Sequence, residues 1–413
     1  MLFGLVATIG LVAWLHRPET AVLPGRPGGP TSASGDTSDV RGDAAAALLD
    51  RLVAALRSGP AARVQALAAP GDPAASRELA ELRDNVHTLG IVGLSLRYVD
   101  EDPAALDPAE QQRLRGRGWL GDVQLAWRIG GWDGRDSRLE VAMTFVQTAR
   151  GAAFVSARDD ASRAAPLWLL SRVRAQHSGR ALAVTTADVS PRRFLGLADQ
   201  AVVDVRKVLP RWRGRLVVEV PADQEELDRT LGAQPNAYDG IAAVTTTVDG
   251  SRVPEAPTHI FVNPGVFDPL GPHGSQIVMS HEATHVATDA AVSSMPTWLL
   301  EGFADFVALD HVDLPVSVTA SQVLALVRKQ GAPRQLPDQQ AFDNENKTLG
   351  ATYESAWLAC RLLGQKYGEK RLIAFYRASD RDGSTSRTFH TVLGTDQARF
   401  TRQWRAYLGR LAG

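Results

Sequence analysis

Two histidines and a glutamate stand together in the segment His281-Glu282-Ala-Thr-His285. On a helix, residues i and i+4 share a face, so both imidazoles point to one side and can bind one Zn²⁺ ion. Glu282 lies one step round the same helix, where its carboxylate can act on a metal-held water without binding the metal. The spacing therefore predicts a metal site with a general base beside it.

A second run, Trp298-Leu-Leu-Glu301-Gly-Phe-Ala-Asp305, supplies further acids. Glu301 can complete a ligand set with the two histidines, because carboxylates are common zinc ligands. Asp305 follows by one turn and can hold a ligand histidine through its other ring nitrogen. The alternative is a buried helix with two ordinary hydrogen-bonded histidines. That alternative leaves Glu282, Glu301 and Asp305 as unrelated buried acids, which are costly, so we favour the zinc site.

The surrounding residues predict the two helices that must carry these side chains. Residues 275–291 contain neither Gly nor Pro, and Val278 and Met279 are apolar, as a buried helix requires. Pro296 is typical of the first turn of a helix and predicts the start of the second one.

The two motifs together resemble the gluzincin branch of zinc peptidases, the thermolysin-like or peptidase MA-like superfamily. In that family one helix carries H-E-x-x-H and the next carries a Glu, commonly followed by Gly and then by Ala-Asp or Ala-Glu. The likeness extends as a pattern through most of residues 180–413, where an expected strand at 215–220 and the segment 258–263 resemble the region before the metal site. The resemblance implies a mixed sheet with a helical C-terminal part, Zn²⁺ as cofactor, and a peptide or protein substrate.

The same resemblance implies how hydrolysis would proceed. Glu282 is expected to take a proton from the attacking water and to deliver it to the leaving amine. In several gluzincins a tyrosine or histidine from the helical part stabilises the oxyanion, and Tyr353, opening a predicted helix over 353–364, is the best match. His273 and His311 are weaker matches, and a helix-packing role for Tyr353 stays open.

A peptide substrate commonly pairs with an edge strand beside the metal helix. The segment from Tyr238 to the threonines before Val248 is expected to form this edge. Gluzincin aminopeptidases carry a glutamate in the corresponding G-x-M-E-N motif, whereas Gly240-Ile-Ala-Ala-Val has no acid. This difference favours cleavage within a peptide over removal of its first residue.

Length and composition limit the remaining possibilities. The 413 residues suffice for two domains, and 44% hydrophobic residues are normal for globular cores. The formal net charge of −1 gives no electrostatic case for binding nucleic acid. Cys360 is the single cysteine, which excludes an intramolecular disulfide, and its apolar surroundings predict a core position.

The first 17 residues are expected to form a membrane anchor or a signal-like helix. Residues 2–15 are apolar apart from Thr8, although as a helix they rise only about 21 Å against about 30 Å of hydrocarbon core. Residues 18–42 are rich in Pro, Gly, Ser and Thr and are expected to form a disordered linker. An apolar segment followed by a flexible linker favours a single-pass protein of the cell membrane with its catalytic domain outside. Arg17 weakly favours the opposite orientation. A buried first helix is the alternative.

Residues 43–178 are expected to form a separate α+β domain. Helices are predicted at 44–58 and 75–88, followed by strands at 92–98, 122–129, 138–148, 152–157 and 167–176. Helices followed by a strand meander resemble the cone-like NTF2 fold, a shape that often carries a pocket. Four tryptophans could line such a pocket or could be core and rim residues: Trp119, Trp127, Trp132 and Trp168.

The sequence thus predicts an α+β protein whose second domain, 180–413, is expected to be a zinc metallopeptidase that acts as an endopeptidase. A non-catalytic zinc-containing binding module at the cell surface is the alternative class. A degenerate module has no reason to keep an acid between two ligand histidines, so Glu282 favours catalysis. A cytosolic peptidase with a buried N-terminus is a third possibility.

Overall fold

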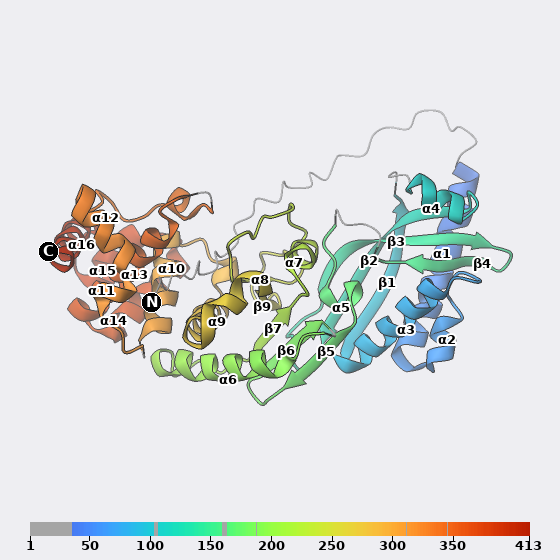
Figure 1. Cartoon of the computed structure of the whole chain (residues 1–413), viewed down its shortest axis with the longest axis horizontal. Helices are drawn as coiled ribbons and strands as arrows, with labels where there is room; N and C mark the ends of the chain where they lie inside the picture. Colours follow the sequence, from blue (N-terminus) through green and yellow to red (C-terminus); the bar gives the residue numbers. More distant parts are fainter. Residues whose placement is uncertain (1–34, 103–105, 159–162, 187, 311, 345) are drawn as a thin grey trace.

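The first sheet is an antiparallel meander of four strands in the order β1-β2-β3-β4 (Figure 1). The computed structural model describes residues 35–413 apart from 103–105, 159–162, 187, 311 and 345. Helices α1 and α3 pack against this sheet, where Leu52 and Leu79 share a core with Phe145 and Phe154. The elements of this part are α1 (Gly35–Ser58), α2 (Ala61–Gln65), α3 (Pro73–Thr88), β1 (Ile91–Glu101), α4 (Pro108–Arg113), β2 (Gly118–Ile129), β3 (Ser137–Thr148) and β4 (Gly151–Ser156).

The second sheet has five strands in the order β5-β6-β7-β9-β8 and occupies the middle of an elongated molecule (Figure 1). Strands β6, β7 and β9 run parallel, whereas β5 and β8 are antiparallel to their neighbours and form the two edges. The expected edge strand beside the metal helix is β8. The elements are α5 (Leu167–Leu170), β5 (Val173–His177), β6 (Ala181–Thr186), α6 (Pro191–Val208), β7 (Leu216–Val220), α7 (Gln224–Leu231), β8 (Ala243–Thr247) and β9 (Thr258–Val262).

Both faces of the second sheet are covered. Ala181 and Ala183 of β6 belong to the core that includes α6 and the metal helix. Leu182 and Val184, which alternate with them, belong to the core of the first sheet, and Val217 of β7 does the same. Side chains alternate between the faces of a strand, so one short strand contributes to both cores.

The C-terminal part is helical and forms the opposite end of the molecule from the first sheet (Figure 1). Helix α9 packs against α6 and β8, and α10 packs against both α9 and α13. Cys360 is buried in α13, which confirms its predicted core position. The elements are α8 (Pro264–Phe267), η1 (Asp268–Leu270), α9 (Gly271–Ala287), η2 (Ala290–Val292), α10 (Thr297–Leu309), α11 (Val316–Thr319), α12 (Ser321–Gln330), η3 (Gln339–Phe342), α13 (Leu349–Tyr367), α14 (Glu369–Asp382), α15 (Thr385–Leu393) and α16 (Gln397–Ala412).

A buried histidine joins the two sheets. His259 on β9 places Nδ1 2.6 Å from Glu219 Oε1 on β7, and Nε2 3.0 Å from Oδ1 of Asp133, in the turn between β2 and β3. Burial alone would lower the pKa of His259, but the charges and hydrogen bonds of Asp133 and Glu219 raise it to about 9. The histidine is therefore held as a cation between two carboxylates at neutral pH.

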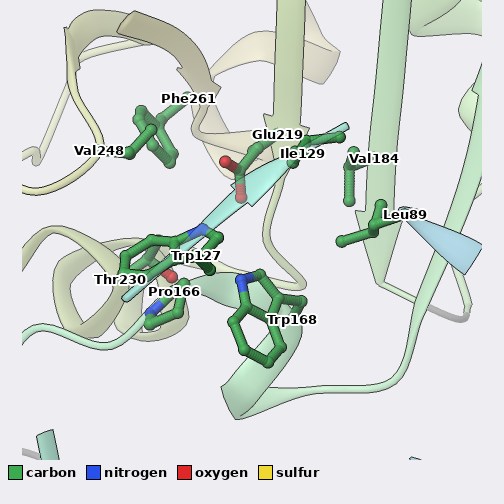
Figure 2. Close-up of a pocket in the computed structure, with 10 residues that line it drawn as sticks. All are labelled: Leu89, Trp127, Ile129, Pro166, Trp168, Val184, Glu219, Thr230, Val248 and Phe261. Carbon is green, nitrogen blue, oxygen red and sulfur yellow. The ribbon is translucent and has the colours of Figure 1, made fainter. Parts of the chain in front are cut away.

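The four tryptophans of the first part are packing residues. Trp127 and Trp168 line a cavity of about 10 Å³ between the two sheets, beside Val184 and Glu219 (Figure 2). That volume has room for roughly one water molecule. Trp119 packs on Phe145 in the core, and Trp132 lies against His177 and Arg215. Trp119, Trp127 and Trp168 are therefore core residues, and the half-buried Trp132 packs at the rim of that core.

The prediction of an α+β fold is confirmed at the level of two sheets with accompanying helices. One predicted strand was wrong in part: residues 167–176 divide into the helical turn α5 and strand β5, which joins the second sheet. An apolar run of this length fits a buried strand or a buried helical turn equally well. The boundary predicted between 178 and 180 lies in the turn between β5 and β6, inside one sheet.

The prediction of a membrane-spanning helix is wrong for the part of the chain that the structure describes. No helix from Gly35 onward is both long enough and apolar enough to cross a bilayer. Residues 1–17, where the anchor was expected, lie outside the described residues, as do 18–34 of the expected linker. Residues 35–42 belong to helix α1 rather than to a disordered linker. The cell-membrane location, which depended on the anchor, is dropped with it.

Candidate metal centre

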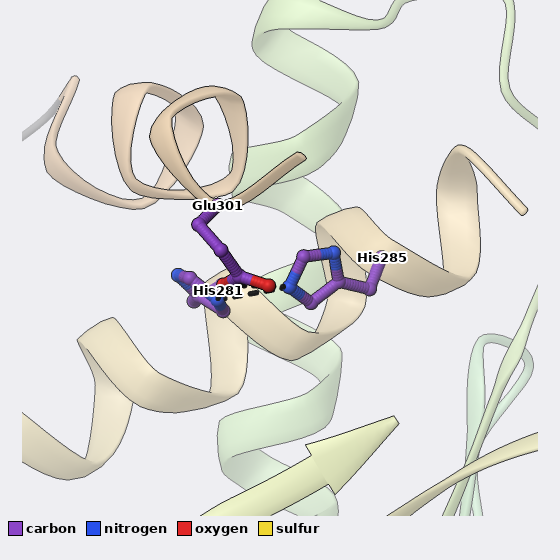
Figure 3. Close-up of side chains that lie close together, drawn as sticks. All are labelled: His281, His285 and Glu301. Atoms are coloured by element: carbon purple, nitrogen blue, oxygen red, sulfur yellow. Dashed lines mark hydrogen bonds and ion pairs between the residues drawn. The ribbon is translucent and has the colours of Figure 1, made fainter. Parts of the chain in front are cut away.

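Helix α9 carries both histidines on one face, and α10 brings Glu301 to them. Figure 3 shows the Glu301 side chain extending from the neighbouring helix toward both imidazole rings. Glu301 Oε2 lies 3.1 Å from His281 Nε2 and 3.4 Å from His285 Nε2. The two Nε2 atoms are themselves 2.9 Å apart. All three side chains have an exposed fraction of 0–1%.

These three groups fit a bound Zn²⁺ ion. Their ligand atoms lie within 4.8 Å of one another, and imidazole nitrogen and carboxylate oxygen are both zinc ligands. A tetrahedral ion with bonds of about 2.0–2.1 Å separates its ligand atoms by about 3.3 Å. The separations of 2.9, 3.1 and 3.4 Å are close to that value. Three buried ligand atoms thus lie close enough together to bind one cation.

Asp305 lies against the ring nitrogen of His281 that Glu301 does not contact. Its Oδ1 lies 2.8 Å from His281 Nδ1, on the side of the ring away from Glu301. A hydrogen bond from Nδ1–H fixes the tautomer in which Nε2 carries the free lone pair. Without a metal, burial would lower the pKa of His281, but Asp305 and Glu301 raise it to about 10. A metal ion must therefore displace a proton from His281.

The carboxyl groups of the site differ in their charge state. Burial would raise the pKa of Glu301, but the charges of His285 and His281 and their hydrogen bonds lower it to about 2. Burial raises the pKa of Asp305 and of Glu282, despite the nearby histidines. Glu301 is thus the most firmly ionised of the three acids, which suits a ligand.

Glu282 lies beside the site, fully buried, and outside the cluster of ligand atoms. Its Oε2 accepts a hydrogen bond of 2.7 Å from the hydroxyl of Thr245 on β8. Its Oε1 is buried and has no hydrogen-bond partner among the described residues. The sequence analysis expected this strand beside the metal helix but missed Thr245, because the register of β8 decides which of its three threonines faces Glu282.

Tyr353 is the one predicted oxyanion group that the structure brings to the site. It lies in the first turns of α13, with its ring centroid 6.4 Å from that of His281. Burial, together with the charges of Glu301 and Asp305, raises its pKa well above the usual value, so the hydroxyl keeps its proton. The hydroxyl oxygen is buried and unpartnered within the described part of the chain. His273 is exposed near the start of α9, and His311 lies outside the described residues.

Gly302 of α10 allows α13 to pack close against α10. A Cβ atom built on Gly302 would stand 2.4 Å from the carbonyl oxygen of Ala356 and 3.1 Å from Cys360 Sγ. Only glycine permits this contact of α10 with α13, one turn along from Tyr353. The glycine after the predicted ligand Glu301 thus has a packing reason that depends on a distant helix.

The site is closed in this conformation. His281, Glu282 and Glu301 are each 0% exposed, and Tyr353 is covered by Phe342 of η3, with the two rings 5.2 Å apart edge to face. The side chains of the site therefore have almost no contact with solvent in this conformation. No protein-family model matches this sequence, and a search of curated proteins finds no significant match.

Proposed function

We propose that this protein is a zinc-dependent peptidase of the gluzincin type, in which His281, His285 and Glu301 hold the metal. The observation that carries the proposal is the convergence of these three ligand atoms within 4.8 Å, in a fully buried site, with Glu282 beside it. An ordinary pair of core histidines would not need three further buried carboxyl groups around it.

Zn²⁺ bound by these ligands would supply a Lewis acid and lower the pKa of the water it holds. Glu282 is placed to take the proton of the attacking water and to pass it to the leaving amine, because its Oε1 has no other hydrogen-bond partner among the described residues. Asp305 keeps the His281 ring oriented. Tyr353, which stays protonated, could donate a hydrogen bond to the carbonyl oxygen as negative charge develops there.

The substrate class follows from the edge of the sheet. Strand β8 is an edge strand packed on α9, so an extended peptide pairing with it would run beside the metal ligands. Residues 240–244, which correspond to the aminopeptidase motif, contain no acid that could bind a free amino terminus. We therefore propose an endopeptidase acting on peptide or unfolded protein substrates.

The fold supports this proposal at a finer level as well. The four strands β6 to β9, followed by helices that carry the proposed metal ligands and Tyr353, are the arrangement expected of a gluzincin domain over 180–413, and β5 adds a fifth strand at the edge of their sheet. We propose that residues 43–178 form an NTF2-like domain, since helices precede an antiparallel meander in that order. We assign this first domain no catalytic residue.

A non-catalytic zinc module is the second candidate, and the complete burial of the site favours it. A structural zinc ion is usually closed off from solvent, whereas a catalytic one keeps a position open to water and substrate. The two functions predict the same metal content but different effects of changing Glu282.

The experiment that tests the proposal measures zinc and hydrolysis together. Purified full-length protein is expected to contain about one zinc per chain by elemental analysis and to cleave fluorescein-labelled casein. Glu282→Gln keeps the size of the side chain but cannot accept the proton, so it is expected to retain zinc and lose roughly 10²-fold or more in rate. Glu225→Gln changes an exposed glutamate on α7 and serves as the matched control.

Two results would contradict the proposal. Protein without stoichiometric zinc, after growth and purification with zinc present, would remove the metal site. Zinc at full occupancy in a parent protein that hydrolyses nothing would favour the non-catalytic module, and a Glu282→Gln variant as active as the parent would remove Glu282 as the general base.

A further inference from the structure

We infer that Thr245 is a positioning residue for Glu282: its hydroxyl holds one carboxylate oxygen so that the other stays available beside the metal ligands. The inference rests on the proposed function, in which Glu282 moves the proton. It names a residue on the sheet that contributes to catalysis without touching metal or substrate.

The hydrogen bond itself is short and fully enclosed. Thr245 Oγ1 lies 2.7 Å from Glu282 Oε2, and both residues are 0% exposed. The same hydroxyl lies 3.1 Å from the backbone oxygen of Glu282. A hydroxyl has one proton to donate, and the carboxylate is the closer and more strongly charged acceptor. The bond to the side chain is therefore the one that forms.

The place of Thr245 in the strand indicates that its hydroxyl is not needed for packing. In β8, Ala243 pairs with Val262 and Thr245 with Ile260 of β9. Ala243, Val262 and Ile260 all belong to the apolar core that α9 covers. Valine has the shape of threonine without the hydroxyl, and a hydroxyl buried in apolar surroundings is costly unless it is hydrogen-bonded. Here the hydrogen bond goes to Glu282.

Without this donor, neither carboxylate oxygen of Glu282 would have a side-chain partner among the described residues, and a carboxylate turns easily about its last torsion. A misplaced general base slows the chemical step while leaving substrate binding nearly unchanged. The expected signature is thus a fall in kcat with a nearly constant KM, and with the zinc retained.

The test compares Thr245→Val with Thr245→Ser in the full-length, zinc-loaded protein. Thr245→Val keeps the shape and removes the donor, and we expect kcat on a fluorogenic casein-derived peptide to fall roughly 10- to 100-fold with KM within about twofold. Thr245→Ser keeps the donor and should recover most of the loss. Thr247→Val is the matched control: Thr247 lies on the same strand, is buried, and donates instead to the Ser251 carbonyl.

Crystal structures of the same zinc-loaded proteins give a readout that does not depend on hydrolysis. The Glu282 carboxylate is expected in one orientation in the parent and in Thr245→Ser, and turned or in several orientations in Thr245→Val. If Thr245→Val does not fold, Thr245→Ala removes the donor with less bulk and takes its place.

The outcomes separate the two hypotheses. An inactive parent protein would count against the proposed peptidase function, and the carboxylate orientation would then still decide whether Thr245 positions Glu282. An unchanged orientation, or an active parent whose Thr245→Val variant keeps its kcat, would overturn the inference. So would a Thr245→Ser variant as slow as Thr245→Val.

Discussion

Gly302 and Ala356 set the distance between the two helices that face the metal centre. A Cβ atom on Gly302 would stand 2.4 Å from the Ala356 carbonyl oxygen, a distance that no packed structure allows. Because Glu301 precedes Gly302 and Tyr353 lies one turn before Ala356, this contact brings the proposed ligand and the proposed oxyanion donor together.

Gly302→Ala is therefore expected to push α13 away from α10. Overpacking of this kind costs about 1–3 kcal/mol of unfolding free energy, more than the roughly 1 kcal/mol that alanine gains over glycine in a helix. The midpoint temperature of thermal unfolding and the rate of hydrolysis should both fall. Gly409→Ala in α16 is the matched control, since its added Cβ would meet nothing within 4 Å, and it should be neutral or stabilising. A Gly302→Ala protein as stable as the parent would show that the helices adjust freely.

His285→Ala is expected to lose most of the bound zinc. It removes one of only three proposed protein ligands, and the remaining pair of ligands binds zinc much more weakly. Elemental analysis after dialysis measures the loss. His273→Ala alters an exposed histidine on the same helix and should keep its zinc. Full occupancy in His285→Ala would place the metal somewhere else.

Asp305→Asn is expected to weaken zinc affinity by roughly 10- to 100-fold. The amide can still accept from His281 Nδ1, 2.8 Å away in the parent, but it no longer offers a negative charge to the ring. Competition with a chromophoric chelator measures the affinity. Asp310→Asn, which changes an exposed acid at the end of α10, should bind like the parent. Equal zinc affinities of the two variants would show that Asp305 does not support zinc binding.

His259 should make stability depend on pH in the alkaline range. Its pKa is raised in the folded protein to about 9, above the ordinary value of 6.5. Its contribution is therefore fully present below about pH 6.5 and is lost as the pH rises through about 9, and it amounts to roughly 3 kcal/mol. Urea unfolding of the zinc-loaded protein at pH 7 and at pH 10 measures this loss.

His259→Gln should lack this contribution, so the stability gap between parent and variant is expected to shrink from pH 7 to pH 10. His390→Gln changes an exposed histidine and should follow the parent at both values. A gap of the same size at both pH values would mean that the ring is not held as a cation.

Residues close in sequence could be placed from spacing alone. The helical repeat puts His281 and His285 on one face and sets Asp305 one turn beyond Glu301, and the structure brings all four together. Their roles as zinc ligands and as support for a ligand stay predictions. The alternation of strand residues and the turn residues between them likewise indicated the strands of the first sheet, whereas the second sheet was expected from the family resemblance.

What the sequence could not indicate depends on partners far along the chain. Thr245 meets Glu282, 37 residues later, only because β8 lies at the edge next to β9 and under α9. The packing role of Gly302 needs the path of α13. Nothing in the sequence indicated that α1 extends into residues 35–42. A helix, once nucleated, can propagate through residues of modest helix propensity.

The two-sided second sheet makes the halves of this molecule one cooperative unit. Leu182, Val184 and Val217 complete the core of the first sheet. The residues that alternate with them along β6 and β7 complete the core around α9. A fragment that begins at residue 180 would lack β5 and would expose an apolar face of the second sheet. Neither half is therefore a natural module for expression or exchange. Heat would therefore unfold the metal centre and the distant meander in a single transition rather than one after the other.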